Sequence, residues 1–178
     1  MSLVAADYAL REDIILLVGF DRVQISVCPD ILCAISRPFK KMLGPNFLEG
    51  QEQDDHDSKQ VMLPDDKPVA MEMMCNIIQH RNGNLPPRPT AMEIYDLAIA
   101  ADKYDCVMAT SLAARAWMQL DSVSNAHDLG LFMLAAYIYA FPEIFFQVTA
   151  RLVLSYNGSY QTLDNIPGFM EHFGWEVM

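Results

Sequence analysis

The hydrophobic pattern at the start of the chain predicts a β-hairpin. Residues 14–18 form a wholly apolar run rich in β-branched side chains, which is typical of a strand covered on both faces. Residues 23–27 alternate strictly between apolar and polar side chains, as expected of a half-buried strand. Four residues that include Gly19 separate the two runs, so we expect a short turn between antiparallel strands.

Two short helices and a third strand are expected to follow the hairpin. Pro29 and Asp30 end the second strand and suit a helix start, so helices are predicted over 30–35 and 38–43. The apolar residues 61–63 predict the third strand. The first part of the chain is therefore predicted to form a small three-stranded sheet with helices between its strands.

The pattern after the third strand is helical. Asp66 is expected to cap one helix, and the capping box of Thr90 and Glu93 predicts the start of the next. Asp105 is expected to cap a third helix. The predicted apolar face of that third helix comprises Ala109, Ala113, Ala116, Trp117 and Leu120.

The most apolar part of the chain, residues 129–154, is long enough to span a membrane. Pro142 and Glu143 interrupt it, so we expect two helices, over 125–140 and 142–156, and no membrane span. The order of elements predicts an α+β fold in which helices surround the sheet and an all-helical C-terminal extension follows. The extension must bury an apolar face against the same chain or against a partner, and the sequence leaves both open.

Composition narrows the range of partners. The chain has 178 residues, of which 52% are hydrophobic, so a sizeable core is expected. Its 23 acidic and 12 basic side chains give a net charge of −11, which repels phosphate. Nucleic acid and anionic membranes are therefore not expected as partners.

The cysteines point to a reducing compartment. Cys28, Cys33, Cys75 and Cys106 lie far apart and form no C-x-x-C pair. The first dozen residues have no long apolar stretch typical of a signal peptide. We therefore expect buried thiols and a cytoplasmic or nuclear protein.

Several sequence blocks, taken together, resemble a BTB (POZ) domain. They are Asp13 before the first strand, residues 31–42 (ILCAISRPFKKM), residues 61–66 (VMLPDD) and residues 97–104 (LAIAADKY). The resemblance covers residues 13–118 and implies a BTB/POZ-like domain over 1–120. The helices after Asp121 resemble the tail of BTB proteins common in filamentous fungi, which implies a helical extension over 121–178 packed on that domain.

The resemblance implies a protein–protein interaction module without chemistry of its own. Members of this family dimerise, bind repressors or present substrates to cullin-type ubiquitin ligases, so an adaptor or scaffold with a protein partner is expected. Dimeric members have a charged pocket to which the aspartate at Asp13 contributes. The basic residue of that pocket usually lies at the end of the second strand, where this chain has Cys28 and Pro29. Dimeric members also carry a helix before the first strand, but only twelve residues precede Asp13 here. The elements of the usual homodimer are therefore incomplete.

The resemblance also indicates where a partner would bind. Cullin adaptors often carry a hydrophobic-x-acidic triplet near the start of the helix that ends in Lys-Tyr, and residues 94–96 have this chemistry one position out of register. The acidic segment 49–60 is expected to be a solvated loop that tunes encounter with a basic partner. The residues expected to form an exposed partner surface are Phe47, Leu48, Ile94, Tyr95, Asp96 and Tyr104.

Two other functions stay open at this point. No G-x-S-x-G, phosphate loop, H-E-x-x-H or metal-spaced histidine pair occurs, so no enzyme, cofactor or metal site is expected. The alternative is a BTB-fold small-molecule binder or unusual enzyme with an apolar pocket between core and extension, where His127 and Asp128 are the best ionisable candidates. Ordinary helix N-terminal residues over a core explain that pair more simply. A regulatory homo-oligomer is the third hypothesis.

Overall fold

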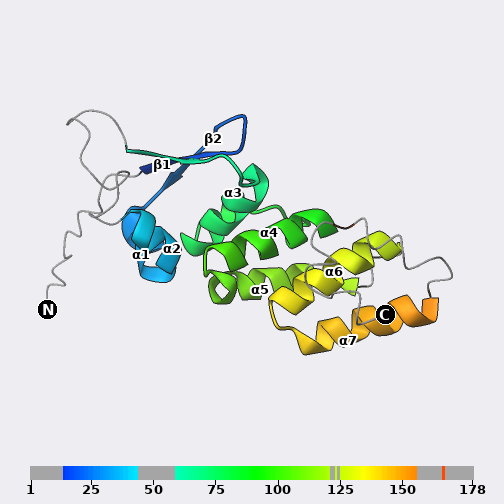
Figure 1. Ribbon diagram of the computed structural model, residues 1–178. Coiled ribbons are helices and arrows are strands. Elements are labelled where there is room, and N and C mark those ends of the chain that lie inside the picture. The colour runs from blue at the N-terminus through cyan, green and yellow to red at the C-terminus, as the bar shows by residue number, and fades with distance from the viewer. Residues whose placement is uncertain (1–13, 44–58, 121–122, 124, 156–165, 167–178) are drawn as a thin grey trace, which may run out of the picture.

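A mixed three-stranded sheet forms one end of the molecule (Figure 1). The computed structural model describes residues 14–43, 59–120, 123, 125–155 and 166. Strand β1 (Ile14–Val18) lies in the centre, antiparallel to β2 (Val23–Val27) and parallel to β3 (Gln60–Leu63). The predicted hairpin is confirmed, because its two strands span the two predicted runs.

The sheet register turns alternate side chains of each strand towards the helices. Leu16 of β1 pairs with Ile25 of β2 and with Val61 of β3, and all three are buried. Gly19 begins the hairpin turn with a φ of +73°, a left-handed conformation that glycine adopts without strain. A Cβ at this position would also lie 3.0 Å from the ring of Pro68, so the turn and the helix after β3 fit closely together.

Two short helices connect the hairpin to β3. Helix α1 (Pro29–Ile35) has proline in its first turn, and α2 (Arg37–Met42) is capped by Ser36, whose side chain accepts a hydrogen bond from the backbone of Phe39. A parallel strand pair cannot be joined by a tight turn, and these helices lie within the longer connection that it needs. Their predicted positions are confirmed to within one residue.

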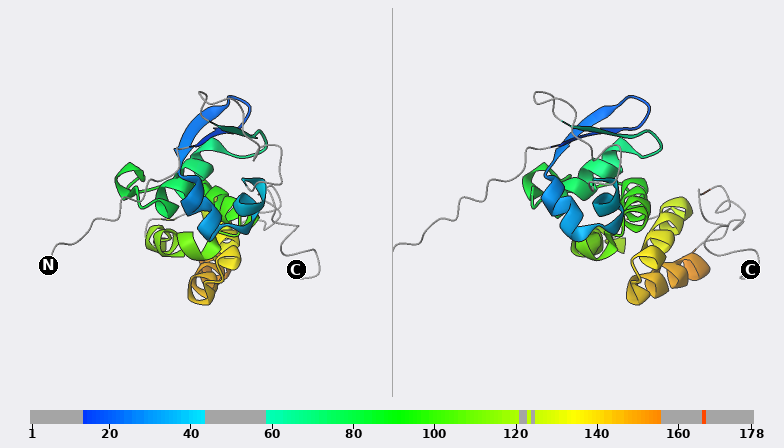
Figure 2. Two further views of the ribbon diagram at one scale, coloured as in Figure 1. Left: turned by 90° about the vertical axis from the view of Figure 1, so that its left-hand side faces the viewer. Right: turned by 60° about the vertical axis from the view of Figure 1, so that its left-hand side comes forward.

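Three longer helices form the layer below the sheet (Figures 1 and 2). Helix α3 (Pro68–Ile78) packs against α4 (Ala91–Lys103), and α5 (Val107–Trp117) contacts both. The predicted capping box is confirmed, since Thr90 and Glu93 exchange hydrogen bonds at the start of α4. A short 3₁₀ turn, Asn82–Asn84, lies between α3 and α4.

Two predicted helix caps are wrong. Lys67 is the N-cap residue of α3 and Cys106 that of α5, and neither side chain makes a capping hydrogen bond. Asp66 instead accepts hydrogen bonds from the side chains of two residues near the end of α4. Asp105 has a left-handed φ of +55° in the turn between α4 and α5. Neither aspartate therefore caps a helix, although the local sequence predicted that role for both.

The helical extension packs on the rest of the chain. Helix α6 (Ala126–Ile138) begins at its cap Asn125, lies against α4, and is followed by α7 (Pro142–Ser155), which packs on α6. Every residue of α6 from Leu129 to Ala136 is buried, so this helix is enclosed by α4 on one side and α7 on the other. Within the described residues, the fold is α+β, and the extension buries its apolar face in the same hydrophobic core as the sheet.

Candidate functional site

A groove of about 460 Å³ lies beside α2, where α4 turns into α5. Its lining residues are Arg37, Pro38, Lys41, Met42 and Asp105. The apolar side chains of Pro38 and Met42 are half-buried, whereas Arg37, Lys41 and Asp105 are exposed. The groove thus combines apolar contact area with a charged rim.

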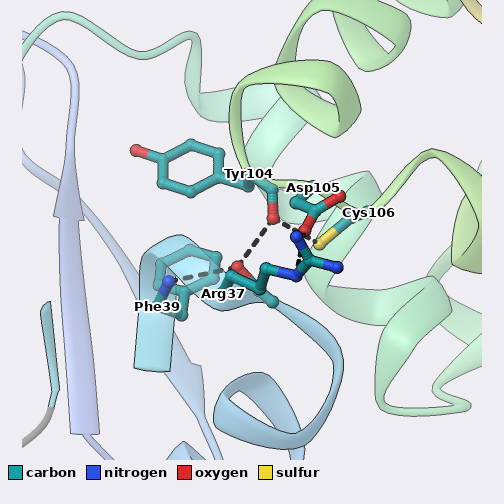
Figure 3. A network of polar contacts seen from close by, with 6 residues as sticks. Arg37, Phe39, Tyr104, Asp105 and Cys106 are labelled. Carbon is teal, nitrogen blue, oxygen red and sulfur yellow. Dashed lines mark hydrogen bonds and ion pairs between the residues drawn. The ribbon is translucent and has the colours of Figure 1, made fainter. Parts of the chain in front are cut away.

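The groove wall is held by a buried serine. The Ser36 hydroxyl caps α2 by accepting from the Phe39 backbone N–H at 3.1 Å, and it donates to the Tyr104 carbonyl at 2.6 Å. Figure 3 shows this network, which joins α2 to the end of α4. Ser36 is 1% exposed, so both hydrogen bonds lie out of water, and losing the serine would leave the Phe39 N–H without its capping acceptor.

Two aromatic rings stack beneath the same junction. The rings of Phe39 and Tyr104 lie 4.5 Å apart between centroids and within 8° of parallel. The Tyr104 hydroxyl donates to Asp66 Oδ2 at 2.6 Å, and Lys103 Nζ donates to the other carboxylate oxygen at 2.7 Å. Burial, together with the hydrogen bond to Asp66 and its negative charge, raises the pKa of Tyr104. Tyr104 therefore stays neutral and fixes the groove end of α4.

The turn from α4 to α5 supplies the acidic side of the groove. Arg37 Nε lies 3.4 Å from Asp105 Oδ2, and both side chains are more than half exposed, so this ion pair adds little to stability. The Cys106 thiol behind it donates to the Tyr104 carbonyl at 3.2 Å. Burial raises the pKa of Cys106 to about 11, with Asp105 adding to the rise and a hydrogen bond with Ser36 opposing it. This thiol is neutral and structural.

Helix α2 is basic in an acidic protein. Arg37, Lys40 and Lys41 are three of the 12 basic residues of the chain, and all three are exposed on a helix of six residues. The net charge of the whole chain is −11. The groove therefore presents a local positive rim, which favours an acidic partner.

The residues proposed from the sequence as a partner surface lie elsewhere. Ile94 is 0%, Tyr95 3% and Tyr104 3% exposed, so the expectation that these side chains are exposed is wrong. Ile94 and Tyr95 belong to α4, which packs against α3, α5 and α6, and Tyr104 caps the end of this helix and stacks on Phe39 of α2. The helical period alone does not distinguish a packed face from a binding face. Asp96 is 15% exposed and forms an ion pair of 2.7 Å with Lys67. Phe47, Leu48 and Asp13, together with segment 49–58, lie outside the described residues.

The sequence contains a signal for the groove in the block 36–39, which also belongs to the BTB/POZ resemblance. A capped helix of six residues with its cations on one side and one buried phenylalanine indicates an exposed basic face. What the sequence could not indicate is that Asp105, 68 residues beyond Arg37, closes the groove.

A second cavity, of about 430 Å³, lies between the core and the extension. Its lining comprises Pro87, Arg88, Pro89, Thr90, Ala91, Ala116, Trp117, Gln119, Val123, Asp128 and Phe132. Arg88 and Gln119 are exposed, so the site is more polar than the apolar pocket that the sequence predicted. His127 does not line it, and its Nδ1 lies 3.6 Å from Asp128 Oδ1 with both side chains well exposed.

The search for other kinds of site covered the described residues. Among them, no three His, Cys, Asp or Glu side chains are grouped so as to hold a metal ion. None of the helices in the described part of the chain is long and apolar enough to cross a membrane. The four cysteines, all within the described residues, form no disulfide, and Cys28, Cys75 and Cys106 are buried while Cys33 is half-buried. Comparison with known proteins finds no family model that matches the chain and no curated protein of significantly similar sequence.

Proposed function

We propose that this protein is a protein–protein interaction module, an adaptor or scaffold, whose α2 groove binds an acidic partner segment. The observation that carries the proposal is the groove itself: Pro38 and Met42 offer apolar contact, and Arg37 and Lys41 add positive charge on an acidic chain. An apolar centre with a charged rim is the usual layout of a protein interface. The occupant is a segment with an apolar side chain flanked by aspartate or glutamate.

A rigid support favours binding at this groove. Ser36, Phe39 and Tyr104 lock α2 onto the end of α4 through buried hydrogen bonds and a ring stack. A wall held in this way loses little conformational entropy when a partner binds. The groove is therefore prepared for binding without rearrangement.

The BTB/POZ resemblance supports the same class of function. The α+β architecture, with its mixed sheet and a helical extension, is compatible with the fold that the resemblance implies. Under this proposal the partner is a cullin-type ubiquitin ligase or a component of transcriptional regulation. The N-terminal domain of a cullin is therefore the first intact protein to test.

The experiment selects peptides from a random display library on the wild-type protein alone and then tests every enriched peptide on an Arg37→Glu/Lys41→Glu variant. Enriched peptides are titrated by fluorescence anisotropy, and a cullin N-terminal domain is titrated in parallel by calorimetry. Lys41→Glu is expected to weaken binding at least roughly tenfold, since it replaces a favourable contact with like charge. Affinity is also expected to fall as salt rises.

Lys40 provides a matched control for this experiment. It is an exposed lysine in the same last turn of α2 but does not line the groove. Lys40→Glu makes the same charge change at the same helix end and is expected to alter affinity less than about threefold. Peptides that bind wild type and the Arg37→Glu/Lys41→Glu variant equally well would refute the groove as the binding site.

The second cavity favours one other function, a small-molecule binder. Its volume of about 430 Å³ lies within the usual range of ligand sites, and it brings Trp117 and Phe132 together with Arg88. An anionic aromatic probe, anilinonaphthalene sulfonate, matches that chemistry. Energy transfer from Trp117 in a Trp175→Phe background should saturate, and Arg88→Ala should weaken it. Energy transfer that never saturates, or that Arg88→Ala leaves unchanged, would contradict this second function.

A further inference from the structure

Five large apolar side chains are exposed on two helices of the described structure. On α5, Met108 is 86% and Leu112 is 82% exposed. On α7, Phe146 is 72%, Val153 71% and Leu154 83% exposed. Both helices lie on the side of the molecule away from the sheet in every view (Figures 1 and 2). We call these five residues the α5–α7 stripe.

An ion pair joins the two halves of the stripe. Arg115 Nη2 lies 3.7 Å from Glu143 Oε2, and the Arg115 guanidinium carbon lies 4.3 Å from the centre of the Phe141 ring. Arg115 follows Leu112 by three positions on α5, and Glu143 precedes Phe146 by three positions on α7, so each shares a helix face with its apolar neighbour. Arg115 and Glu143 therefore lie between the apolar residues of α5 and those of α7.

The summed apolar surface of the stripe is at the upper end of what monomers leave exposed in a single patch. Side chains of this size and exposure present on the order of 600 Å² of apolar surface, the upper end of what typical monomers show. A standard interface buries about 800 Å² on each partner. The stripe thus provides most of the apolar area that a stable dimer needs, and its polar neighbours such as Gln147 provide a rim.

We infer that the α5–α7 stripe is a self-association surface that binds a second copy of this chain. The order apolar, positive, negative, apolar is self-complementary. A two-fold axis through the Arg115–Glu143 pair sets Met108 and Leu112 of one copy against the α7 residues of the other, and each Arg115 against the partner's Glu143. The five apolar residues of the stripe do not line the α2 groove, and the inference does not depend on the proposed function.

Net charge modulates this association. Each copy carries −11, so two copies repel each other at long range while the stripe attracts them at contact. Salt screens the long-range repulsion and leaves apolar contact intact. Dimerisation is therefore expected to strengthen with added sodium chloride, whereas binding of an acidic segment at the α2 groove weakens.

Sedimentation velocity across a concentration series of the full chain tests the inference. Wild type is expected to dimerise with a dissociation constant in the micromolar range. Leu112→Glu and Phe146→Glu each should raise that constant at least roughly tenfold, because they place a charge in the centre of the interface. Phe20→Glu is the matched control, since Phe20 is 96% exposed in the β1–β2 turn and lies outside the stripe.

A charge exchange separates a contact between copies from a contact within one copy. Arg115→Glu and Glu143→Arg should each weaken self-association, whereas an equimolar mixture of the two variants should form a heterodimer within about threefold of wild-type affinity. A contact internal to one chain gives no such recovery on mixing. A wild type that stays monomeric to about 0.5 mM, or a dimer that survives Leu112→Glu and Phe146→Glu, would overturn the inference.

Discussion

The Tyr104 hydroxyl donates a hydrogen bond of 2.6 Å to Asp66 Oδ2, which joins the end of α4 to the segment before α3. The Tyr104 carbonyl accepts from Ser36, and its ring stacks on Phe39. Tyr104 alone thus connects the end of α4 to α2 and to the segment before α3. Positions around Tyr104 are therefore expected to dominate the stability of this end of the molecule.

Tyr104→Phe is expected to lower the free energy of unfolding by about 1–2 kcal/mol. The substitution keeps the stacked ring and removes only the hydroxyl that pairs with Asp66, whose side chain is 8% exposed. Urea denaturation measures the loss. Lys103→Met, which removes the other partner of Asp66 from a half-exposed position, should cost less than about 0.5 kcal/mol. Equal losses for the two variants would contradict this ranking.

Ser36→Ala is expected to cost about 2 kcal/mol, because it removes the cap of α2 and leaves the Tyr104 carbonyl with only the weakly donating Cys106 thiol. Ser111→Ala is the comparison. Ser111 lies inside α5 and its hydroxyl bonds only the Met108 carbonyl of the same helix, so alanine there should leave stability unchanged within about 0.5 kcal/mol. Thermal or urea unfolding measures the stability of both variants. A Ser36→Ala protein as stable as Ser111→Ala would contradict the role of the cap.

Gly19→Ala is expected to destabilise the protein by about 1–2 kcal/mol. The left-handed φ of +73° strains any side chain, and the new Cβ would lie 3.0 Å from Pro68. Gly83 is the control, since its φ is not left-handed and nothing lies within 4 Å of a Cβ built there. Gly83→Ala should be neutral, and similar losses at the two positions would rule out the turn explanation.

Stability is expected to fall as pH rises above about 9. Burial raises the pKa of Cys75 from 9.0 to about 12 and that of Cys106 to about 11. The folded protein therefore holds neutral thiols that the unfolded chain ionises first, so their contribution is complete below pH 9 and is lost as pH rises towards 12. Urea unfolding at pH 8 and pH 10.5 measures the loss.

The control for the pH effect is Cys75→Ala, whose stability should depend less steeply on pH than that of wild type, whatever its absolute value. Alkylation with iodoacetamide at pH 8 gives a second readout. The half-buried Cys33 should react first, and Cys75 and Cys106 only on unfolding. Stability that is constant to pH 11 would contradict these pKa directions.

Local sequence rules predicted the elements well. The hairpin, the capping box of Thr90 and Glu93, and the breaks around Pro142 depend on residues close together in sequence, so the pattern contained the information needed. The prediction of the apolar face of α5 was less accurate. Thr110 and Ala114 are its buried residues, whereas the predicted Ala116 is exposed, because a helix of small side chains shows little contrast between its faces.

Long-range contacts limited the prediction of the site. The sequence predicts Asp66 and Asp105 as helix caps, yet Asp66 binds residues 37 and 38 positions away and Asp105 pairs with Arg37 across the groove. The motif predicts Ile94, Tyr95 and Tyr104 as partner residues, but all three are buried, the first two within α4 and Tyr104 against Phe39 of α2. A one-dimensional pattern identifies apolar faces and cannot say which of them another element covers.

The central claim is that a partner segment binds the α2 groove, and methionine methyl NMR tests it most directly. The chain has 12 methionines, of which Met42 lines the groove and Met108 lies on the α5–α7 stripe. With ¹³C-methyl methionine labelling, adding the acidic peptide selected on wild type should shift the Met42 signal and leave Met108 in place. A peptide that binds without moving Met42, or that shifts Met108 instead, would contradict the account.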